Sequence, residues 1–163
     1  MRANQHIHHD YFDEGFVRAI DQEVLQLLDR VWFRSKLVGF EPFPQRNNPA
    51  RPLIFASNHS GMAFPWDAIV ALAHLLRSLP GLRDMPRPLT APLLSKTALM
   101  NPYLVQHFWK KCGGVEATTL NFETMMYTQD FNLMVYPEGV PGIGKGFNRK
   151  YQLQRLATSM LRM

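Results

Sequence analysis

One histidine and one aspartate, eight positions apart, could form a catalytic pair. His59 follows the short apolar run 53–56, which predicts a buried strand, and Asp67 stands in the first turn of the helix predicted next. A loop between them can fold back and bring the carboxylate to the imidazole. Asp67 would then fix the tautomer of His59 and leave its other ring nitrogen free as a general base. The helix dipole alone also favours an acid in that turn, so a purely structural role stays open.

A glycine-rich segment follows another apolar run, 131–136, and could bind an anion. It reads Tyr-Pro-Glu-Gly-Val-Pro-Gly-Ile-Gly-Lys-Gly over 136–146. Its glycines let the backbone approach a ligand closely and turn amide groups inward. Lys145, Arg149 and Lys150 could supply positive charge to a phosphate. The spacing differs from that of a P-loop, and an ordinary strand-to-helix turn with a solvated basic face explains the segment equally well.

Together the two segments resemble the lysophospholipid and glycerolipid acyltransferases. The shared pattern is Asn-His-Ser-Gly followed by Pro-x-Asp over 58–67, after one apolar strand, and Tyr-Pro-Glu-Gly over 136–139, after another. The spacer between His and Asp is the longer, proline-containing form found in one subgroup. The tail 142–155 and the Gly-Gly-Val at 113–115 are also similar to that subgroup, and the resemblance covers 15–160.

The resemblance implies transfer of a fatty acyl group from acyl-CoA or an acyl carrier protein to a hydroxyl of a glycerolipid-like acceptor. It implies that His59 is the general base and that Asp67 orients it, with no covalent acyl-enzyme and no cofactor beyond the acyl thioester. Glu138 and Gly139 are implied to shape the acceptor pocket. The predicted substrate-binding residues are Asn58, Ser60, Gly61, Pro137, Glu138, Gly139, Lys145 and Arg149.

The chain departs from the family at two arginines that bear on the acceptor. Its second block has Glu116, Thr118 and Thr119 where the family often has an arginine, and Pro141 follows Glu-Gly where another arginine is common. Both differences count against a glycerol phosphate acceptor. The chain also ends at Met163, where the family continues with further strands and a fourth block, so we expect a fragment or a truncated member.

Two other functions are compatible with the sequence. The first is a catalytically vestigial module that binds lipid or phosphate, which the missing arginines and the missing fourth block favour. The second, less favoured, is a serine hydrolase or thioesterase that uses Ser60. The chain has no Gly-x-Ser-x-Gly elbow, and the adjacent side chains of His59 and Ser60 tend to diverge.

Composition and charge indicate the class of protein and its surroundings. Hydrophobic residues make up 46% of the 163 residues and charged residues 19%, which suits one folded domain. The single cysteine, Cys112, excludes an internal disulfide and a cysteine-based zinc site, and we expect no metal. The net charge of +5 suits anionic lipid or a phosphorylated substrate, whereas scattered basic residues argue against nucleic acid. Because no apolar run reaches about 18–20 residues, we expect a cytoplasmic protein, peripheral at the inner face of a membrane.

Strands alternate with helices along the sequence, which predicts an α/β fold with a mostly parallel sheet flanked by helices, like that of the glycerolipid acyltransferases. We expect a flexible leader over 1–15 and one acyltransferase domain over 16–163, incomplete at its C-terminus. The predicted helices are 16–33, 65–79, 101–109, 119–128 and 149–162. The predicted strands are 36–40, 53–56, 89–93 and 131–136. On the first helix the predicted buried face is Val17, Ile20, Val24, Leu27, Leu28 and Val31.

Overall fold

The computed structural model describes residues 11–60, 64–79, 81–96, 101–102 and 105–158, and within them four parallel strands form one sheet in the order β1-β4-β2-β3. The strands are β1 (Ile54–Ala56), β2 (Pro86–Thr90), β3 (Val115–Glu116) and β4 (Asn132–Val135). The helices are α1 (Glu14–Ile20), α2 (Gln26–Leu28), α3 (Trp66–Ser78), α4 (Pro92–Lys96), α5 (Phe108–Lys111), α6 (Thr119–Met125) and α7 (Val140–Ile143). The predicted α/β class with a parallel sheet and flanking helices is confirmed.

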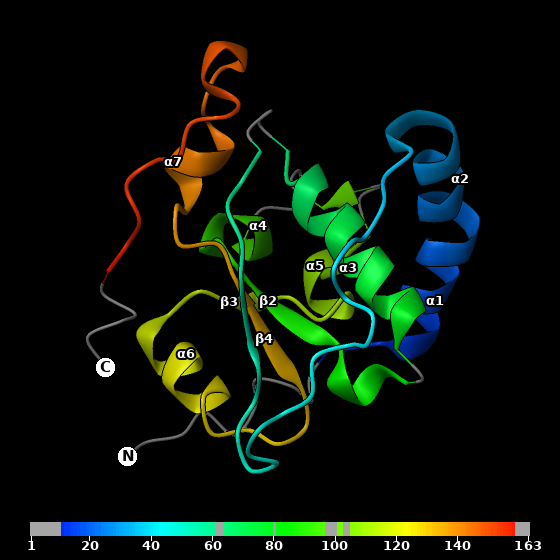
Figure 1. Ribbon diagram of the computed structural model, residues 1–163, viewed down its shortest axis with the longest axis vertical. Helices are drawn as coiled ribbons and strands as arrows, with labels where there is room; N and C mark the ends of the chain where they lie inside the picture. Colours follow the sequence, from blue (N-terminus) through cyan, green and yellow to red (C-terminus); the bar gives the residue numbers. More distant parts are fainter. Residues whose placement is uncertain (1–10, 61–63, 80, 97–100, 103–104, 159–163) are drawn as a thin grey trace.

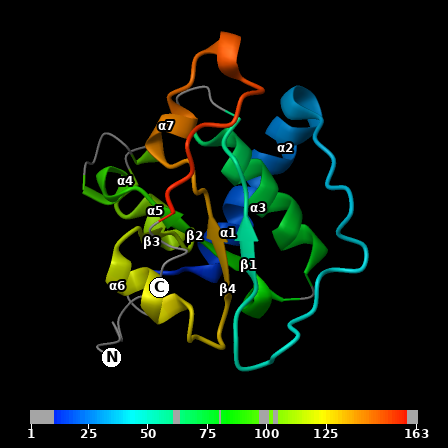
Figure 2. The ribbon, with the colours of Figure 1, turned by 60° about the vertical axis from the view of Figure 1, so that its left-hand side comes forward.

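Helices cover both faces of the sheet (Figures 1 and 2). On one face α6 packs on an apolar cluster made of Val115, Phe122, Met125, Phe131, Leu133 and Val135. The Thr118 hydroxyl caps α6 by accepting a hydrogen bond from Asn121 N at 3.1 Å. On the other side, α3 and the N-terminal helices share a cluster made of Val17, Leu76, Leu82 and Met85. All of β4 is buried, because it lies between two strands and between these two layers.

The N-terminal helical segment runs from Glu14 to Phe33 and confirms the predicted first helix. It begins where the Asp13 side chain accepts a hydrogen bond from Phe16 N at 2.9 Å. Two stretches, Asp21–Leu25 and Asp29–Phe33, are π-helical. The wider turns of a π-helix rotate the apolar stripe away from the position that a regular helix would give it. The predicted buried face is therefore wrong at Leu27 and Val31, which are 61% and 59% exposed.

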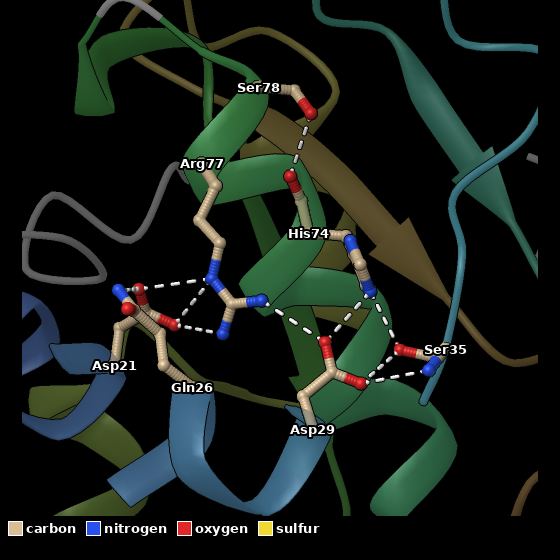
Figure 3. Close-up of polar contacts among 7 residues, drawn as sticks. All are labelled: Asp21, Gln26, Asp29, Ser35, His74, Arg77 and Ser78. Atoms are coloured by element: carbon tan, nitrogen blue, oxygen red, sulfur yellow. Dashed lines mark hydrogen bonds and ion pairs between the residues drawn. The ribbon is translucent and has the colours of Figure 1, made fainter. Parts of the chain in front are cut away.

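A polar network fixes this helical segment to α3 (Figure 3). Arg77 of α3 donates hydrogen bonds to both oxygens of Asp21 through Nε (3.0 and 3.2 Å), another to Asp21 Oδ1 through Nη2 at 2.7 Å, and one to Asp29 Oδ2 at 3.2 Å. Asp29 also accepts a hydrogen bond from the Ser35 hydroxyl and lies 3.1 Å from His74 Nε2. Since Ser35 and Asp29 both contact the same ring nitrogen of His74, these residues do not form the relay of a serine hydrolase. The network therefore joins the N-terminal helical segment to α3.

The strand β2 starts three residues earlier than predicted, and the two prolines in it explain why the prediction missed its start. The predicted strand 89–93 begins after Pro86 and Pro88, and a proline cannot donate to a strand ladder. The carbonyl of Thr90 accepts a hydrogen bond from Ala117 N, so alternate residues of β2 point their backbone groups toward β3. The short β3 pairs only with the last two residues of β2. Both proline nitrogens therefore face the β3 side of the strand, at positions before the two residues that pair with β3.

Two other predicted elements are wrong in the described residues. The segment 36–40 has no regular structure, and Val38 is largely exposed, because the segment pairs with no neighbouring strand. The segment 150–158, predicted as part of a basic helix, runs back along the glycine-rich turn, and Ala157 N donates a hydrogen bond to Pro137 O at 2.7 Å. Its backbone groups thus bond to another segment of the chain and not within a helix.

Smaller differences concern where elements lie and end. The strand β1 is at the edge of the sheet, so it is partly exposed where a buried strand was predicted. Of the predicted helix 101–109, the described residues include only α5, which ends before Gly113 with its positive φ of 89°. The predicted leader falls mainly on 1–10, which lie outside the described residues.

Candidate active site

The structure brings His59 and Asp67 together at the carboxyl edge of the sheet. His59 follows β1 by three residues, and Asp67 is the second residue of α3. His59 Nδ1 lies 3.0 Å from Asp67 Oδ2, and Ser60 N donates to the same oxygen at 2.8 Å. The backbone contact from Ser60 fixes the carboxylate while the imidazole bonds to it. The two ends of the segment between strand and helix therefore meet as the spacing predicts.

The electrostatics of this pair favour one tautomer of the imidazole. Burial raises the pKa of the Asp67 carboxyl, but hydrogen bonds from His59 and from Ser60 N outweigh it and hold the pKa below its ordinary value. The ionised carboxylate accepts, so the Nδ1 of His59 carries the proton and its Nε2 is the basic nitrogen. His59 is only 5% exposed. The pair is thus arranged as a general base with an orienting acid.

Tyr136 and Gly142 enclose the imidazole. The Tyr136 ring stacks on the His59 ring with centroids 4.2 Å apart and planes 13° from parallel. Burial and the Asp67 charge raise the pKa of Tyr136, so its phenol is neutral. A Cβ on Gly142 would lie 3.1 Å from the Cβ of His59 and would overlap the Glu138 carboxylate. Sequence reasoning named Gly142 only among the glycines of a possible ligand-binding loop, and it missed Tyr136 as a site residue, although Tyr136 directly precedes the Pro-Glu-Gly motif.

An apolar cavity of about 590 Å³ opens beside His59. Its walls come from the N-terminal helical segment, from α3, and from the loops that follow β2 and β4. Apolar wall residues include Val24, Leu28, Ile69, Leu72, Met85 and Trp109. Polar side chains are few, and Tyr136 and Asp21 are among them. The sequence predicted most of these residues only as parts of helices, because a cavity depends on how separate helices pack.

The Pro-Glu-Gly turn brings its backbone to the cavity and turns its acid away. Gly139 has φ 59° and ψ −151°, a conformation that favours glycine, and it lines the cavity together with Val140. Glu138 is buried, does not line the cavity, and bonds to Lys145 Nζ at 3.2 Å. The carbonyl of Pro137 accepts the hydrogen bond from the segment 150–158.

Asn58, Ser60 and Arg149, which were also predicted to bind substrate, do not line the cavity. Asn58 and Ser60 are exposed next to His59, and Gly61 lies outside the described residues. Arg149 is exposed on the short helical turn Phe147–Arg149 and does not line the cavity. In the described ranges, no cluster of three histidine, cysteine or acidic side chains could hold a metal ion. Among the same residues, no helix combines the length and the apolar character needed to cross a bilayer.

Curated mycobacterial proteins match most of this chain. The uncharacterized protein Rv0502 of Mycobacterium tuberculosis (strain ATCC 25618 / H37Rv) is 28% identical over 144 residues, which are 88% of this chain and 37% of that protein. The uncharacterized protein Mb0514 of Mycobacterium bovis gives the same values, and ML2427 of Mycobacterium leprae is 27% identical over 88% of this chain and 36% of its own length. No family model matches the chain, and no solved structure matches it with significance. The chain thus spans little more than a third of the length of the curated relatives it matches.

Proposed function

We propose that this chain carries the active site of an acyltransferase that moves a fatty acyl group from an acyl-CoA or acyl carrier protein thioester to a hydroxyl of a glycerolipid-like acceptor. The observation that carries the proposal is the His59–Asp67 pair, whose imidazole is buried, beside an apolar cavity of about 590 Å³. The pair supplies a base, and the cavity can hold a long apolar group.

The reaction needs no nucleophile from the protein. His59 Nε2 takes the proton from the acceptor hydroxyl, and the oxygen attacks the carbonyl carbon of the thioester. The tetrahedral intermediate then collapses, the carbon–sulfur bond breaks, and the imidazolium returns its proton to the leaving thiolate. Asp67 stabilises the imidazolium between these two steps. Ser60 contacts Asp67 through its backbone N–H, so its support of the pair does not use the hydroxyl.

The shape of the cavity supports a fatty acyl chain as the transferred group. Its walls are mostly apolar, and it reaches from His59 to Val24 and Leu28 on the N-terminal helical segment. Burying each methylene contributes about 0.8 kcal/mol, so a cavity of this kind favours a long chain over a short one. The thioester carbon would lie at the His59 end.

Contact with a membrane surface is part of the proposal. The last turn of the N-terminal helical segment and the turn after α7 lie at the same end of the molecule in both views (Figures 1 and 2). They expose Trp32, Phe147 and Tyr151, and Lys150 Nζ lies 3.8 Å from the Phe147 ring centroid. Exposed aromatic residues beside cations suit an anionic bilayer surface. We expect co-sedimentation with phosphatidylglycerol vesicles to weaken in Trp32→Ser but not in Leu120→Ser on α6; equal binding of both variants would argue against this surface.

The direct test of the proposed function is thiol release in the presence of a hydroxyl acceptor. The wild type should release CoA from a long-chain acyl-CoA when a lysophospholipid or monoacylglycerol is added, and folded His59→Ala should not. Release of CoA by His59→Ala at the wild-type rate would exclude His59 as the general base. Binding of the acyl-CoA by the wild type with no release would favour the vestigial lipid-binding module, since the cavity alone suffices for binding.

A further inference from the structure

We infer that Glu138 and Lys145 are positioning residues, whose buried ion pair holds the α7 turn against His59. The kinetic part of this inference rests on the proposed acyltransferase function, whereas its structural part does not. The sequence predicts both residues as substrate-binding. The geometry points instead to an action of the two residues on each other and, through the backbone between them, on the base.

The two side chains are closed off from solvent and from the cavity. The Glu138 side chain is 0% exposed and that of Lys145 is 2% exposed. Glu138 Oε2 accepts from Lys145 Nζ at 3.2 Å, and Oε1 accepts from Gln154 N at 3.1 Å. Lys145 Nζ also donates to Gln152 O at 3.0 Å. Each charged group thus has its partners inside the protein, and neither would reach a substrate without breaking them.

Glu138 is joined to His59 through Gly142. Gly142 of α7 packs between Glu138 and His59, since a Cβ at that position would overlap the carboxylate and would lie 3.1 Å from the His59 Cβ. The same carboxylate also accepts a hydrogen bond from Gln154 N, in the segment 150–158 that runs back along the glycine-rich turn. Glu138 therefore fixes two segments at once, the α7 turn and the residues that run back past Pro137. A shift of the carboxylate moves the surface on which His59 rests.

A buried pair of this kind makes a specific non-additive prediction. Removing one partner leaves the other charge buried and uncompensated, whereas removing both charges leaves none. Glu138→Gln and Lys145→Met should therefore each disturb His59, and the double variant should restore it in part. A displacement of about 1 Å at a catalytic group costs about 100-fold in rate, so we expect kcat losses of that order in the single variants.

The distinction from substrate contact lies in the kinetic constants. If Glu138 positions the base, both single variants lower kcat and leave the acceptor KM close to the wild-type value. If Glu138 binds the acceptor, Glu138→Gln raises the acceptor KM, and Lys145→Met does not repair it in the double variant. Arg155→Met is the matched control, because Arg155 is an exposed cation on the same returning segment.

The decisive measurement is an NMR spectrum of protein with isotope-labelled histidine, which needs no activity. We expect the ring signals of His59 to shift in Glu138→Gln and in Lys145→Met, to return toward the wild-type positions in the double variant, and to be unmoved in Arg155→Met. His59 signals unchanged in both single variants would overturn the inference. If a single variant does not fold, Lys145→Arg, which keeps the charge, should preserve the His59 signals, and their loss would also overturn it. If the NMR coupling is present but the wild type releases no thiol, the positioning stands and the proposed function fails.

Discussion

Replacing Asp67 by asparagine removes the charge beside His59 and keeps the shape of the side chain. In the wild type, Asp67 Oδ2 accepts from His59 Nδ1 at 3.0 Å and from Ser60 N at 2.8 Å. An asparagine can turn either its oxygen or its NH₂ group toward these two donors. Because Ser60 N needs an acceptor at that position, the amide oxygen should stay there and the tautomer of His59 should survive.

The size of the effect follows from the lost charge. A hydrogen bond to a charged group contributes about 1.5–3 kcal/mol, and the imidazolium that forms during transfer would lose that support. Since about 1.4 kcal/mol corresponds to a factor of ten in rate, we expect kcat/KM to fall about 10- to 150-fold. A turned amide, with its NH₂ toward His59, would force the wrong tautomer and remove general-base catalysis, with a loss of about 10²–10⁴.

Thiol release from acyl-CoA with a hydroxyl acceptor measures this loss. Asp84→Asn is the matched control. Asp84 is a half-exposed carboxylate 3.3 Å from Arg46. It precedes β2 and so lies at the amino ends of the strands, whereas His59 and Asp67 lie at their carboxyl ends. We expect the activity of Asp84→Asn to equal that of the wild type. Wild-type activity in a folded Asp67→Asn variant would refute the orienting role of the carboxylate.

The same variant should change the response of the fold to acid. In the folded protein the pKa of the Asp67 carboxyl lies below its ordinary value of 3.8. The ionised carboxylate therefore stabilises the fold above pH 3.8, and this stabilisation is lost as the pH falls through the pKa of the folded state. Asp67→Asn lacks this contribution at every pH. The stability difference between wild type and variant, measured by urea unfolding, should therefore shrink below about pH 4. A difference that grows on acidification contradicts the assignment of an ionised Asp67.

Three further changes test the site and its support. Gly142→Ala should destabilise the fold by about 1–3 kcal/mol, because its Cβ overlaps a buried carboxylate, whereas Gly144→Ala, whose nearest neighbour would be 3.5 Å away, should be close to neutral in thermal unfolding. Arg77→Met leaves two buried carboxylates without their cation and should cost about 3–5 kcal/mol in urea unfolding, against no more than about 1 kcal/mol for Arg18→Met at an exposed pair. Ala73→Phe fills part of the apolar cavity and should weaken binding of long fatty acids more than of short ones in a fluorescent displacement assay; equal weakening would argue against the cavity as the acyl site.

The parts of the fold that were predictable are those that local sequence decides. The helix over Trp66–Ser78 and the strand over Asn132–Val135 carry clear periodicity or a continuous apolar run, and both are confirmed. His59 and Asp67 also come together as their spacing suggests. Packing decides the rest. The stretch Lys36–Phe40 has an apolar run but no neighbour to pair with, and β2 contains two prolines that only an incompletely paired side tolerates.

The candidate site shows the same division. The motif and the family resemblance predicted His59 and Asp67 as a pair, and the two side chains meet because they stand close to the end of one strand and the start of one helix. The motif could not identify Tyr136 as the ring that stacks on His59, nor the pairing of Glu138 with Lys145, because these contacts depend on how the turn after β4 packs on the loop after β1. The apolar cavity likewise arises where helices remote in sequence meet.

The measurement that tests the central claim most directly is detection of the transferred group itself. The protein is incubated with an acyl-CoA labelled in its acyl chain and with a glycerolipid that has a free hydroxyl, and the acylated lipid is quantified by mass spectrometry. We predict labelled product with the wild type and none with folded His59→Ala. Equal amounts of product from both proteins, or binding of the acyl-CoA by the wild type with no labelled product from any hydroxyl acceptor, would contradict the account.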